Sequence, residues 1–227
     1  MTEAPVAGPD VPDKPGMTRT DRRKARTRAS LVRAAQQLIA EGRSSVPILE
    51  ITQLADVGMG SFYNHFETKD DLFQAAVDDA LERHGTLMDA LTADLDDPAE
   101  AFAQSFRLTG RLHRVAPELS KVLLSYGPGM VTSGRGLAPR ALRDIRLAVE
   151  AGRFTVADPE IGLTVAGGAA LALGQLLHDR PERDDATTTD ETTEAVLRML
   201  GLPPEEAAEL CRRPLPEVRV AADGSVA

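Results

Sequence analysis

The chain has 227 residues, of which 42% are hydrophobic and 27% are charged, a balance that is typical of a soluble globular protein with a sizeable core. Its formal net charge of −9 is unevenly distributed: residues 14–69 hold ten Lys or Arg and five Asp or Glu, whereas the other residues hold 16 basic and 30 acidic groups. A basic region attached to an acidic body attracts a polyanion at one end only.

The rarer side chains exclude several classes of protein. The single cysteine, Cys211, cannot form an internal disulfide, which favours a reducing compartment, and no stretch has the length and apolarity of a membrane span. Residues 1–16 have neither the basic start nor the apolar run of a signal peptide, so we expect a cytoplasmic protein without a membrane partner. No metal site and no cofactor are predicted, because the four histidines are far apart in the sequence and lack partners at ligand spacing: His65, His84, His113 and His178.

The first predicted elements are a tail and a long basic helix. Residues 1–17 are acidic and rich in proline and glycine, which predicts a disordered tail, and the true start is either Met1 or Met17. Apolar spacing predicts a helix over about residues 20–41, ended by Gly42. Six cations crowd its start and oppose the helix dipole, so they favour a bound phosphate, with a solvated charged end as the alternative: Arg19, Arg22, Arg23, Lys24, Arg26 and Arg28.

Two short helices joined by a tight turn come next. Apolar residues at helical spacing after Pro47 predict the first of them over residues 48–55. Asp56 tolerates the left-handed backbone that a sharp turn needs, and Gly58 opens the second helix. Phe62 and Phe66 share the core face of that helix, whereas its other face carries Met59, Gly60, Ser61, Tyr63 and Asn64. Such a helix, anchored on one side and small or polar on the other, is typical of a helix-turn-helix recognition helix.

The remainder of the chain is predicted to be helical. Thr68 and Asp71 form the pattern of a capping box, which starts a helix that extends to about Leu95, with a candidate kink at Gly85. Further helices are predicted at about 99–115, 117–126, 138–152, 158–179, 187–201 and 204–213. No segment shows sustained strict alternation, so the predicted fold is all-α. Three segments are predicted to lack helix: a mobile connection or pocket gate at 127–136, a solvated loop at 180–191 and a disordered tail at 214–227.

The helix predicted at 158–179 is unusually apolar and contains three glycines. Gly167, Gly168 and Gly174 each cost about 1 kcal/mol of helix stability relative to alanine. Close approach of a second helix explains them better than local preference does.

The residues between 28 and 72 carry a family resemblance. They match in one fixed order and without gaps the DNA-binding domain of TetR-family transcriptional regulators: Arg28, Leu31, Ala34, Ala35, Leu38, Ile39, Glu41, Gly42, Ile51, residues 55–66, Lys69 and Leu72. Asp56, Gly58 and the Val46-Pro47 pair depart from the usual pattern. The resemblance implies a three-helix helix-turn-helix domain over residues 18–66 and a larger helical ligand-binding and dimerisation domain over residues 67–213, with about nine or ten helices in all.

The resemblance also assigns roles to residues of the first domain. Phe62, Phe66, Val57, Leu54 and Ile51 are expected in its core. For His65, a packing role at the helix end is an equal alternative to a phosphate contact. The residues expected to contact DNA are Arg22, Arg26, Arg28, Ser45, Met59, Gly60, Ser61, Tyr63, Asn64, His65 and Lys69.

For the second domain the expectations are a ligand pocket and a dimer interface. The aromatic-poor composition singles out pocket candidates, each with plain core as the alternative: Phe102, Phe106, Leu123, Tyr126 and Phe154. A cluster at Arg107, Arg111, His113 and Arg114 is expected to be a solvated face, or else to meet an anionic ligand. The last two long helices are expected to pair across a twofold axis, with burial inside one subunit as the alternative, through Gly167, Leu171, Gly174, Leu177, Val196 and Met199.

The family resemblance, together with these patterns, implies a sequence-specific DNA-binding transcriptional regulator. The predicted protein is a homodimeric repressor that a small-molecule effector releases from a near-palindromic operator in double-stranded DNA. The alternative is a helical interaction or small-molecule-binding module without DNA binding. We expect no enzyme, because no nucleophile, base or carboxylate pair stands at a catalytic spacing.

Overall fold

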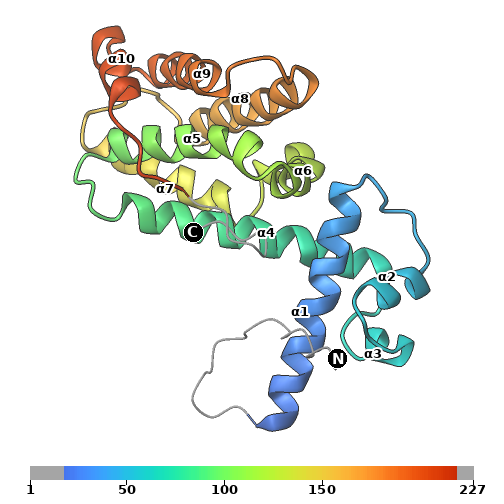
Figure 1. The fold of residues 1–227 in the computed structure, drawn as a ribbon. Helices are drawn as coiled ribbons and strands as arrows, with labels where there is room; N and C mark the ends of the chain where they lie inside the picture. The colour runs from blue at the N-terminus through green and yellow to red at the C-terminus, as the bar shows by residue number, and fades with distance from the viewer. Residues whose placement is uncertain (1–17, 219–227) are drawn as a thin grey trace. The chain divides into compact units, whose positions relative to one another are not determined.

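The computed structural model describes residues 18–218, and these contain helices and no strand (Figure 1). The predicted all-α fold is therefore confirmed. The predicted N-terminal tail, and residues 219–227 of the predicted C-terminal one, lie outside the described residues. The elements are α1 (Arg19–Ala40), α2 (Ile48–Leu54), α3 (Met59–Tyr63), α4 (Lys69–Thr92), α5 (Pro98–Val115), α6 (Pro117–Ser125), η1 (Gly127–Met130), α7 (Leu137–Glu150), α8 (Pro159–Asp179), α9 (Asp185–Met199) and α10 (Pro204–Arg212).

The chain divides into two compact units within α4, between Ala76 and Val77. We call residues 18–76 the head and residues 77–218 the body. The head contains α1, α2, α3 and the first turns of α4, and the body contains the rest of α4 and all later helices. Each unit has its own cluster of buried apolar side chains.

Local signals in the sequence determine the turn and the helix starts of the head. Asp56 is in the left-handed region with a φ of 52°, and Gly58 is the N-cap of α3, as predicted. Phe62 and Phe66 are buried, and their ring centroids lie 6.0 Å apart. At the start of α4, the backbone N–H of Asp71 donates to the Thr68 hydroxyl at 3.1 Å and the N–H of Thr68 donates to the Asp71 carboxylate at 2.9 Å, which is the predicted capping box.

The expected core position of Leu54 is wrong, because its side chain is 41% exposed. The buried side of α2 consists of Ile51, Thr52 and, just after the helix, Ala55. Ile51 and Ala55 are four residues apart and share one face, and Leu54 precedes Ala55 by one residue, or about 100° around the helix axis. A seven-residue helix can bury only a narrow face, so Leu54 points to solvent.

The body is built around α5, which contacts α7, α8, α9 and α10. Figure 1 shows α5 between α7 on one side and α8 with α9 on the other. Its buried aromatic residues, Phe102 and Phe106, belong to the same apolar cluster as Phe154, Leu177 and Leu197. Contrary to the expectation from the sequence, the apolar helix α8 has the length and composition of a membrane span. It packs against α5, α7 and α9, and 33% of its most apolar stretch is buried in this body.

The predicted solvated loop at 180–191 is wrong from Asp185 onward, where α9 begins. Asp184 caps the helix by accepting a hydrogen bond from the Thr187 N–H, and Thr188 and Thr189 are buried. Threonine is a weak helix former, which misled the prediction. Its hydroxyl can bond to a carbonyl four residues earlier, as Thr188 does with Asp184 at 2.7 Å, and this allows burial within a helix.

The predicted solvated face of α5 is also wrong for Arg107 and His113, which are buried. Arg107 Nε donates to the Asp190 carboxylate at 2.8 Å, and Arg111 Nη2 donates to the other oxygen of the same group at 2.9 Å. Arg107 Nη1 also donates to the carbonyl of Arg213 at 2.8 Å. These cations therefore join α5 to α9 and to the end of α10, and they are not available to an anionic ligand.

Two histidines that are distant in the sequence lie together in the body. The Nδ1 atom of His113 is 2.6 Å from the Ser120 hydroxyl, and the same hydroxyl is 2.8 Å from Nε2 of His178. Three elements supply this chain of polar groups: α5, α6 and α8. Since Ser120 is fully buried, the hydrogen bonds offset the cost of removing its hydroxyl from water.

Two of the three α8 glycines singled out from the sequence, Gly167 and Gly174, do allow close approach, and the approach occurs within the body of one chain. A Cβ added at Gly167 would lie 2.7 Å from Val131 Cγ2, and one added at Gly174 would lie 2.5 Å from His113 Cε1. Leu177 and Val196 are buried in the same body. Four of the six expected interface residues therefore pack within their own subunit, because the apolar pattern of α8 continues around the helix and does not reveal which stripe faces inward.

We expect Gly174→Ala to destabilise the protein and Gly168→Ala to leave it unchanged or slightly more stable. The new methyl group at position 174 would overlap His113 and Leu124, and such overpacking costs about 1–3 kcal/mol. A Cβ at position 168 meets nothing within 4 Å and gains up to about 1 kcal/mol of helix propensity. Urea unfolding of both variants at one protein concentration measures the difference. Equal stabilities would contradict the packing assigned to Gly174.

Candidate functional site

The exposed side of α3 is the first candidate surface. Phe62 is fully buried and fixes the helix against the head core, while Met59 and Tyr63 are 45% and 60% exposed. Gly60 and Asn64 are also exposed, and a Cβ added at Gly60 would meet nothing within 4 Å. This side of the helix is therefore open to an external partner.

Cations of α1 lie close to the end of α3. The Arg28 guanidinium carbon is 5.2 Å from the centroid of the Phe66 ring, a cation–π contact that orients Arg28. Partial burial lowers the pKa of His65, and the positive charges of Lys24 and Arg28 lower it further. His65 is thus a neutral ring beside two cations at the end of the recognition helix, where an anion would be stabilised. Arg22 and Arg26 are exposed on α1, the helix that also carries Lys24 and Arg28.

A second set of polar groups joins the start of α4 to the start of α2. The Lys69 ammonium donates to the carbonyl of Val46 at 3.3 Å, which brings it next to the exposed Ser45. Arg43 pairs with the carboxylates of Glu41 and Glu50, so its charge is already neutralised. Of the cations in this part of the head, Lys69 is better placed for an external phosphate than Arg43.

Lys24 belongs to the surface formed by Arg28 and His65, although from the sequence it is named only among the six cations of the first helix and not among the expected DNA contacts. It precedes Arg28 by four residues and therefore shares its helix face, and both charges act on His65. The i, i+4 spacing was the available signal.

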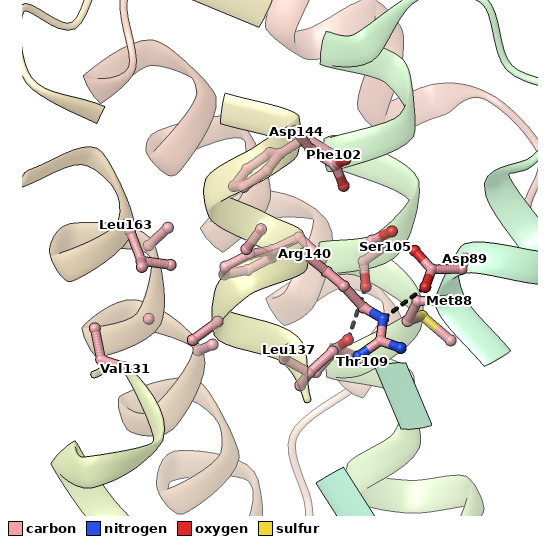
Figure 2. Close-up of a pocket in the computed structure, with 16 residues that line it drawn as sticks. Met88, Asp89, Phe102, Ser105, Thr109, Val131, Leu137, Arg140, Asp144 and Leu163 are labelled. Carbon is pink, nitrogen blue, oxygen red and sulfur yellow. Dashed lines mark hydrogen bonds and ion pairs between the residues drawn. The ribbon is translucent and has the colours of Figure 1, made fainter. Parts of the chain in front are cut away.

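The second candidate site is a cavity of about 90 Å³ in the body (Figure 2). Figure 2 shows Val131 and Leu163 on one side and Asp89, Ser105, Thr109 and the guanidinium of Arg140 on the other. The lining residues come from α4, α5, α7, α8 and the segment after η1: Met88, Asp89, Phe102, Ser105, Phe106, Thr109, Val131, Leu137, Ala138, Arg140, Ala141, Asp144, Leu163, Ala166, Gly167 and Ala170. An engineered apolar cavity of about 150 Å³ binds benzene, so this space is smaller than a ring-binding cavity and must widen to admit a ring.

Ion pairs hold the polar wall of the cavity in place. Arg140 Nε donates to one oxygen of Asp89 at 2.6 Å, and Arg143 Nη2 donates to the other oxygen at 3.0 Å. Arg143 Nε also donates to the Asp144 carboxylate at 2.8 Å. Burial raises the pKa of Asp144 in spite of this pair. The wall therefore presents two carboxylates whose charges are balanced by arginines.

Behind this wall lies a buried histidine. The Thr109 hydroxyl donates to the Ser105 carbonyl at 2.8 Å and lies 3.0 Å from Nε2 of His84. Because that hydroxyl proton is already used, His84 donates through Nε2–H, which leaves Nδ1 as the acceptor. Nδ1 is buried and has no hydrogen-bond partner within the described residues. Burial, with a smaller contribution from His113, lowers the pKa of His84 to about 4.

The structure brings together only some of the expected pocket residues. Phe102 and Phe106 line the cavity, and Phe154 packs edge-on behind Phe102 with ring centroids 5.7 Å apart. Leu123 and Tyr126 are not among the lining residues. The polar residues Asp89, Arg140 and Asp144 were missed because the sequence-based choice rested on aromatic side chains. The spacing of Arg140 and Asp144 on one helix face was the signal that could have revealed them.

Two family models match the chain. Residues 31–76 match the model of bacterial regulatory proteins of the tetR family, and residues 97–213 match the tetracyclin repressor-like C-terminal domain. No curated protein matches the chain at a significant level.

Solved structures with the same fold include two of RolR. RolR in complex with resorcinol is 36% identical, with a TM-score of 0.68 over 86% of this chain and 98% of that one. RolR without ligand is 35% identical, with a TM-score of 0.64 over 83% of this chain and 98% of that one. An ArpA-like gamma-butyrolactone receptor is 20% identical, with a TM-score of 0.58 over 83% of this chain and 96% of that one, and it supports the fold alone.

Buried histidines predict loss of stability in acid. Burial lowers the pKa of both His84 and His113 from 6.5 to about 4 in the folded protein. Between these values the unfolded chain binds more protons, so the stabilisation is complete above about pH 6.5 and is lost as the pH falls toward 4. Each histidine contributes about 1.4 kcal/mol per pH unit in this range.

Urea unfolding between pH 7 and pH 4.5 measures this dependence. We expect His113→Asn, which keeps a polar atom near Ser120 but cannot titrate, to reduce the slope by up to about 1.4 kcal/mol per pH unit. Carboxylates titrate alike in both proteins and cancel in the comparison. An unchanged slope in the variant would contradict the assignment to His113.

Proposed function

The chain belongs to the TetR family of bacterial transcriptional regulators, and on that premise we propose that it is a cytoplasmic homodimeric repressor that a small hydroxylated aromatic compound releases from its operator. The observation that carries this proposal is a cavity of about 90 Å³ whose apolar wall faces a polar wall of Asp89, Arg140 and Asp144. An exposed recognition helix in the head supplies the DNA-binding part.

The head residues divide into two kinds of DNA contact. Met59, Gly60, Ser61 and Asn64 lie on the helix that enters the major groove, and they are proposed to read base edges or to allow close approach. Tyr63 is proposed to contact the flanking backbone. The remaining proposed contacts are to phosphates, which position the head without specifying sequence: Arg22, Arg26, Arg28, Ser45, His65 and Lys69.

The exposed stripe of α8 supports a homodimer. Ile161 is 60% exposed and Leu176 is 38% exposed. Met199 at the end of α9 is 61% exposed. Large exposed apolar side chains on α8 and α9, the last two long helices, suit an isologous interface in which the same stripe meets its copy. Leu171, which is partly buried, remains a proposed member of this interface.

The identity of the effector is proposed from the cavity and from RolR, whose structure holds resorcinol. The side chains of Phe102 and Phe106, and the apolar residues of α8 that line the cavity, can make apolar contacts with a flat aromatic ring. Phenolic hydroxyls can donate to the carboxylates of Asp89 and Asp144, and they can accept from Arg140 by sharing one of its present hydrogen bonds. A ligand carboxylate would add a third negative charge to this wall and is disfavoured.

The alternative, a module without DNA binding, is less well supported. It does not explain why Tyr63 and Met59 are exposed on α3, nor why the cations Lys24 and Arg28 lie near His65 just after that helix. No group of three or more potential metal ligands occurs within the described residues, and the proposed function needs neither metal nor catalysis.

We expect selection from random duplexes to recover a near-palindrome with two related half-sites. Lys69→Ala should weaken binding to all duplexes by about tenfold, because it removes a charged phosphate contact, and should reduce the slope of log K against log salt by about 0.9. Ser61→Ala and Asn64→Ala should instead change the preferred half-site. Arg43→Gln is the matched control, because Arg43 already pairs with Glu41 and Glu50. A selection without repeated half-sites would refute the proposed dimeric reading.

We expect resorcinol to bind the full-length protein and to lower operator affinity by about 5–150-fold, the range of ordinary allosteric coupling. Benzoate should not bind, because its carboxylate would face Asp89 and Asp144. Asp144→Asn removes a carboxylate at nearly constant shape and should weaken resorcinol binding. Titration calorimetry with and without operator measures both effects, since the operator must weaken resorcinol by the same factor. Failure of resorcinol to bind would remove the effector proposal and leave the DNA-binding proposal intact.

A further inference from the structure

A glycine in the middle of α4 lies under the guanidinium of Arg140. Glu82, Gly85, Thr86 and Asp89 are three or four residues apart and share one face of α4. Arg140 of α7 crosses this face, with Nη2 donating to Glu82 at 2.8 Å and Nε donating to Asp89 at 2.6 Å. The two carboxylates are two turns apart, and the glycine lies between them.

The guanidinium occupies the space that a side chain at position 85 would need. A Cβ built on Gly85 would lie 2.7 Å from Nη1, 2.9 Å from Cζ and 3.0 Å from Cδ of Arg140. Carbon and nitrogen atoms do not approach this closely without a bond, so either the methyl group or the arginine must be displaced. A glycine inside a helix costs about 1 kcal/mol relative to alanine, and this contact accounts for its presence in α4.

Arg140 cannot move aside without losing partners. Besides its two carboxylates, it donates through Nη1 to the carbonyl of Gly136 at 2.8 Å. Gly136 has a φ of +70°, and a Cβ there would lie 2.6 Å from Leu81 Cβ, so this backbone is itself held against α4. Nη1 also donates to Glu82 at 3.3 Å and Nη2 to the Thr86 hydroxyl at 3.5 Å, so each nitrogen of the guanidinium is held.

We propose that Gly85 is a positioning residue of the effector site: its missing side chain forms a notch in α4 that holds the Arg140 guanidinium at the polar wall of the cavity, between Glu82 and Asp89. The role as an effector site rests on the proposed function, whereas the notch itself does not. No described atom of Gly85 lines the cavity, so its effect on a ligand is exerted through Arg140.

The notch determines what the cavity recognises. The five N–H groups of Arg140 already have partners in Glu82, Asp89, Thr86 and the Gly136 carbonyl, and its charge is balanced. Arg140 therefore donates to a ligand only by sharing or exchanging one of these bonds, which suits a neutral hydroxylated ring rather than an acid. A methyl group at position 85 would push the guanidinium away from Asp89 and leave that carboxylate with Arg143 as its partner. The cavity would then lose the donor and keep the acceptor, so discrimination between ligands with one and two hydroxyls should decrease.

A double-mutant cycle in unfolding tests the notch without any ligand. We expect Gly85→Ala to lower the thermal unfolding midpoint of the full-length protein. In the Arg140→Ala background the same change should raise the midpoint by about 2–4 °C, because the overlap is gone and only helix propensity remains. A Gly85→Ala effect of the same sign and size in both backgrounds would overturn the proposal.

Titration with resorcinol and phenol tests the positioning role. Gly85→Ala should weaken resorcinol by at least about tenfold and phenol by less, so that the ratio of the two affinities decreases, an effect that a uniform loss of folded protein would not produce. In the Arg140→Ala background, Gly85→Ala should cause no further change. Gly168→Ala, the same substitution at an open helical position, is the control and should leave both affinities unchanged.

The two proposals fail in different ways. Wild-type affinity of Gly85→Ala for resorcinol, with an unchanged ratio to phenol, would overturn the positioning role. If the wild-type protein does not bind resorcinol, the effector proposal fails, and the unfolding cycle alone then supports or overturns the notch.

Discussion

The ion pairs of Arg140 are the contacts on which the polar half of the body cavity depends. One guanidinium joins α7 to two successive parts of α4, at Glu82 and at Asp89. A half-buried carboxylate such as Asp89 would be costly beside an apolar cavity without this partner. The relative register of α4 and α7 is therefore specified by charge as well as by packing, and the direction of each cavity donor follows from that register.

The same principle of paired polar groups applies along α5. Arg107, Thr109 and His113 are within two turns of one another, and each has a partner on another turn or element: Asp190, the Ser105 carbonyl and Ser120. Buried polar groups without such partners cost several kcal/mol, so this central helix tolerates little rotation or sliding. The apolar face of α8 packs against a helix whose position is fixed in this way, which explains why Gly174 is tightly enclosed by His113.

The structural features that could be predicted from the sequence are those whose physical cause lies within a few residues. Asp56, Gly58 and the Thr68–Asp71 capping box act within a few residues, and the head was predicted almost completely from such signals. Leu54 was misplaced because the choice of buried face on a seven-residue helix depends on its neighbours. The threonine-rich start of α9 was missed because tertiary burial there overrides weak helix propensity.

The cavity was the least predictable part, for the same reason. Asp89 and Arg140 are separated by about fifty residues, and nothing local to either distinguishes a cavity wall from a surface salt bridge. Only the fold of α4 against α7 brings them together. Aromatic content was a partial guide: it selected Phe102 and Phe106, but it could not separate them from Phe154, which packs one layer behind.

The magnitudes indicate how a ligand as small as one ring could regulate this protein. Coupling between two sites typically amounts to about 1–3 kcal/mol, and a single hydrogen bond to a charged group is worth about 1.5–3 kcal/mol. Redirecting one contact of Arg140 is therefore sufficient in energy, without a large rearrangement of the body. Because Asp89 lies near the end of the same helix that begins at Lys69, a ligand hydroxyl that competes for Asp89 changes the forces on α4 itself. A neutral ligand is best suited to this, since it alters the geometry of the pairs without adding a charge that the enclosed wall could not balance.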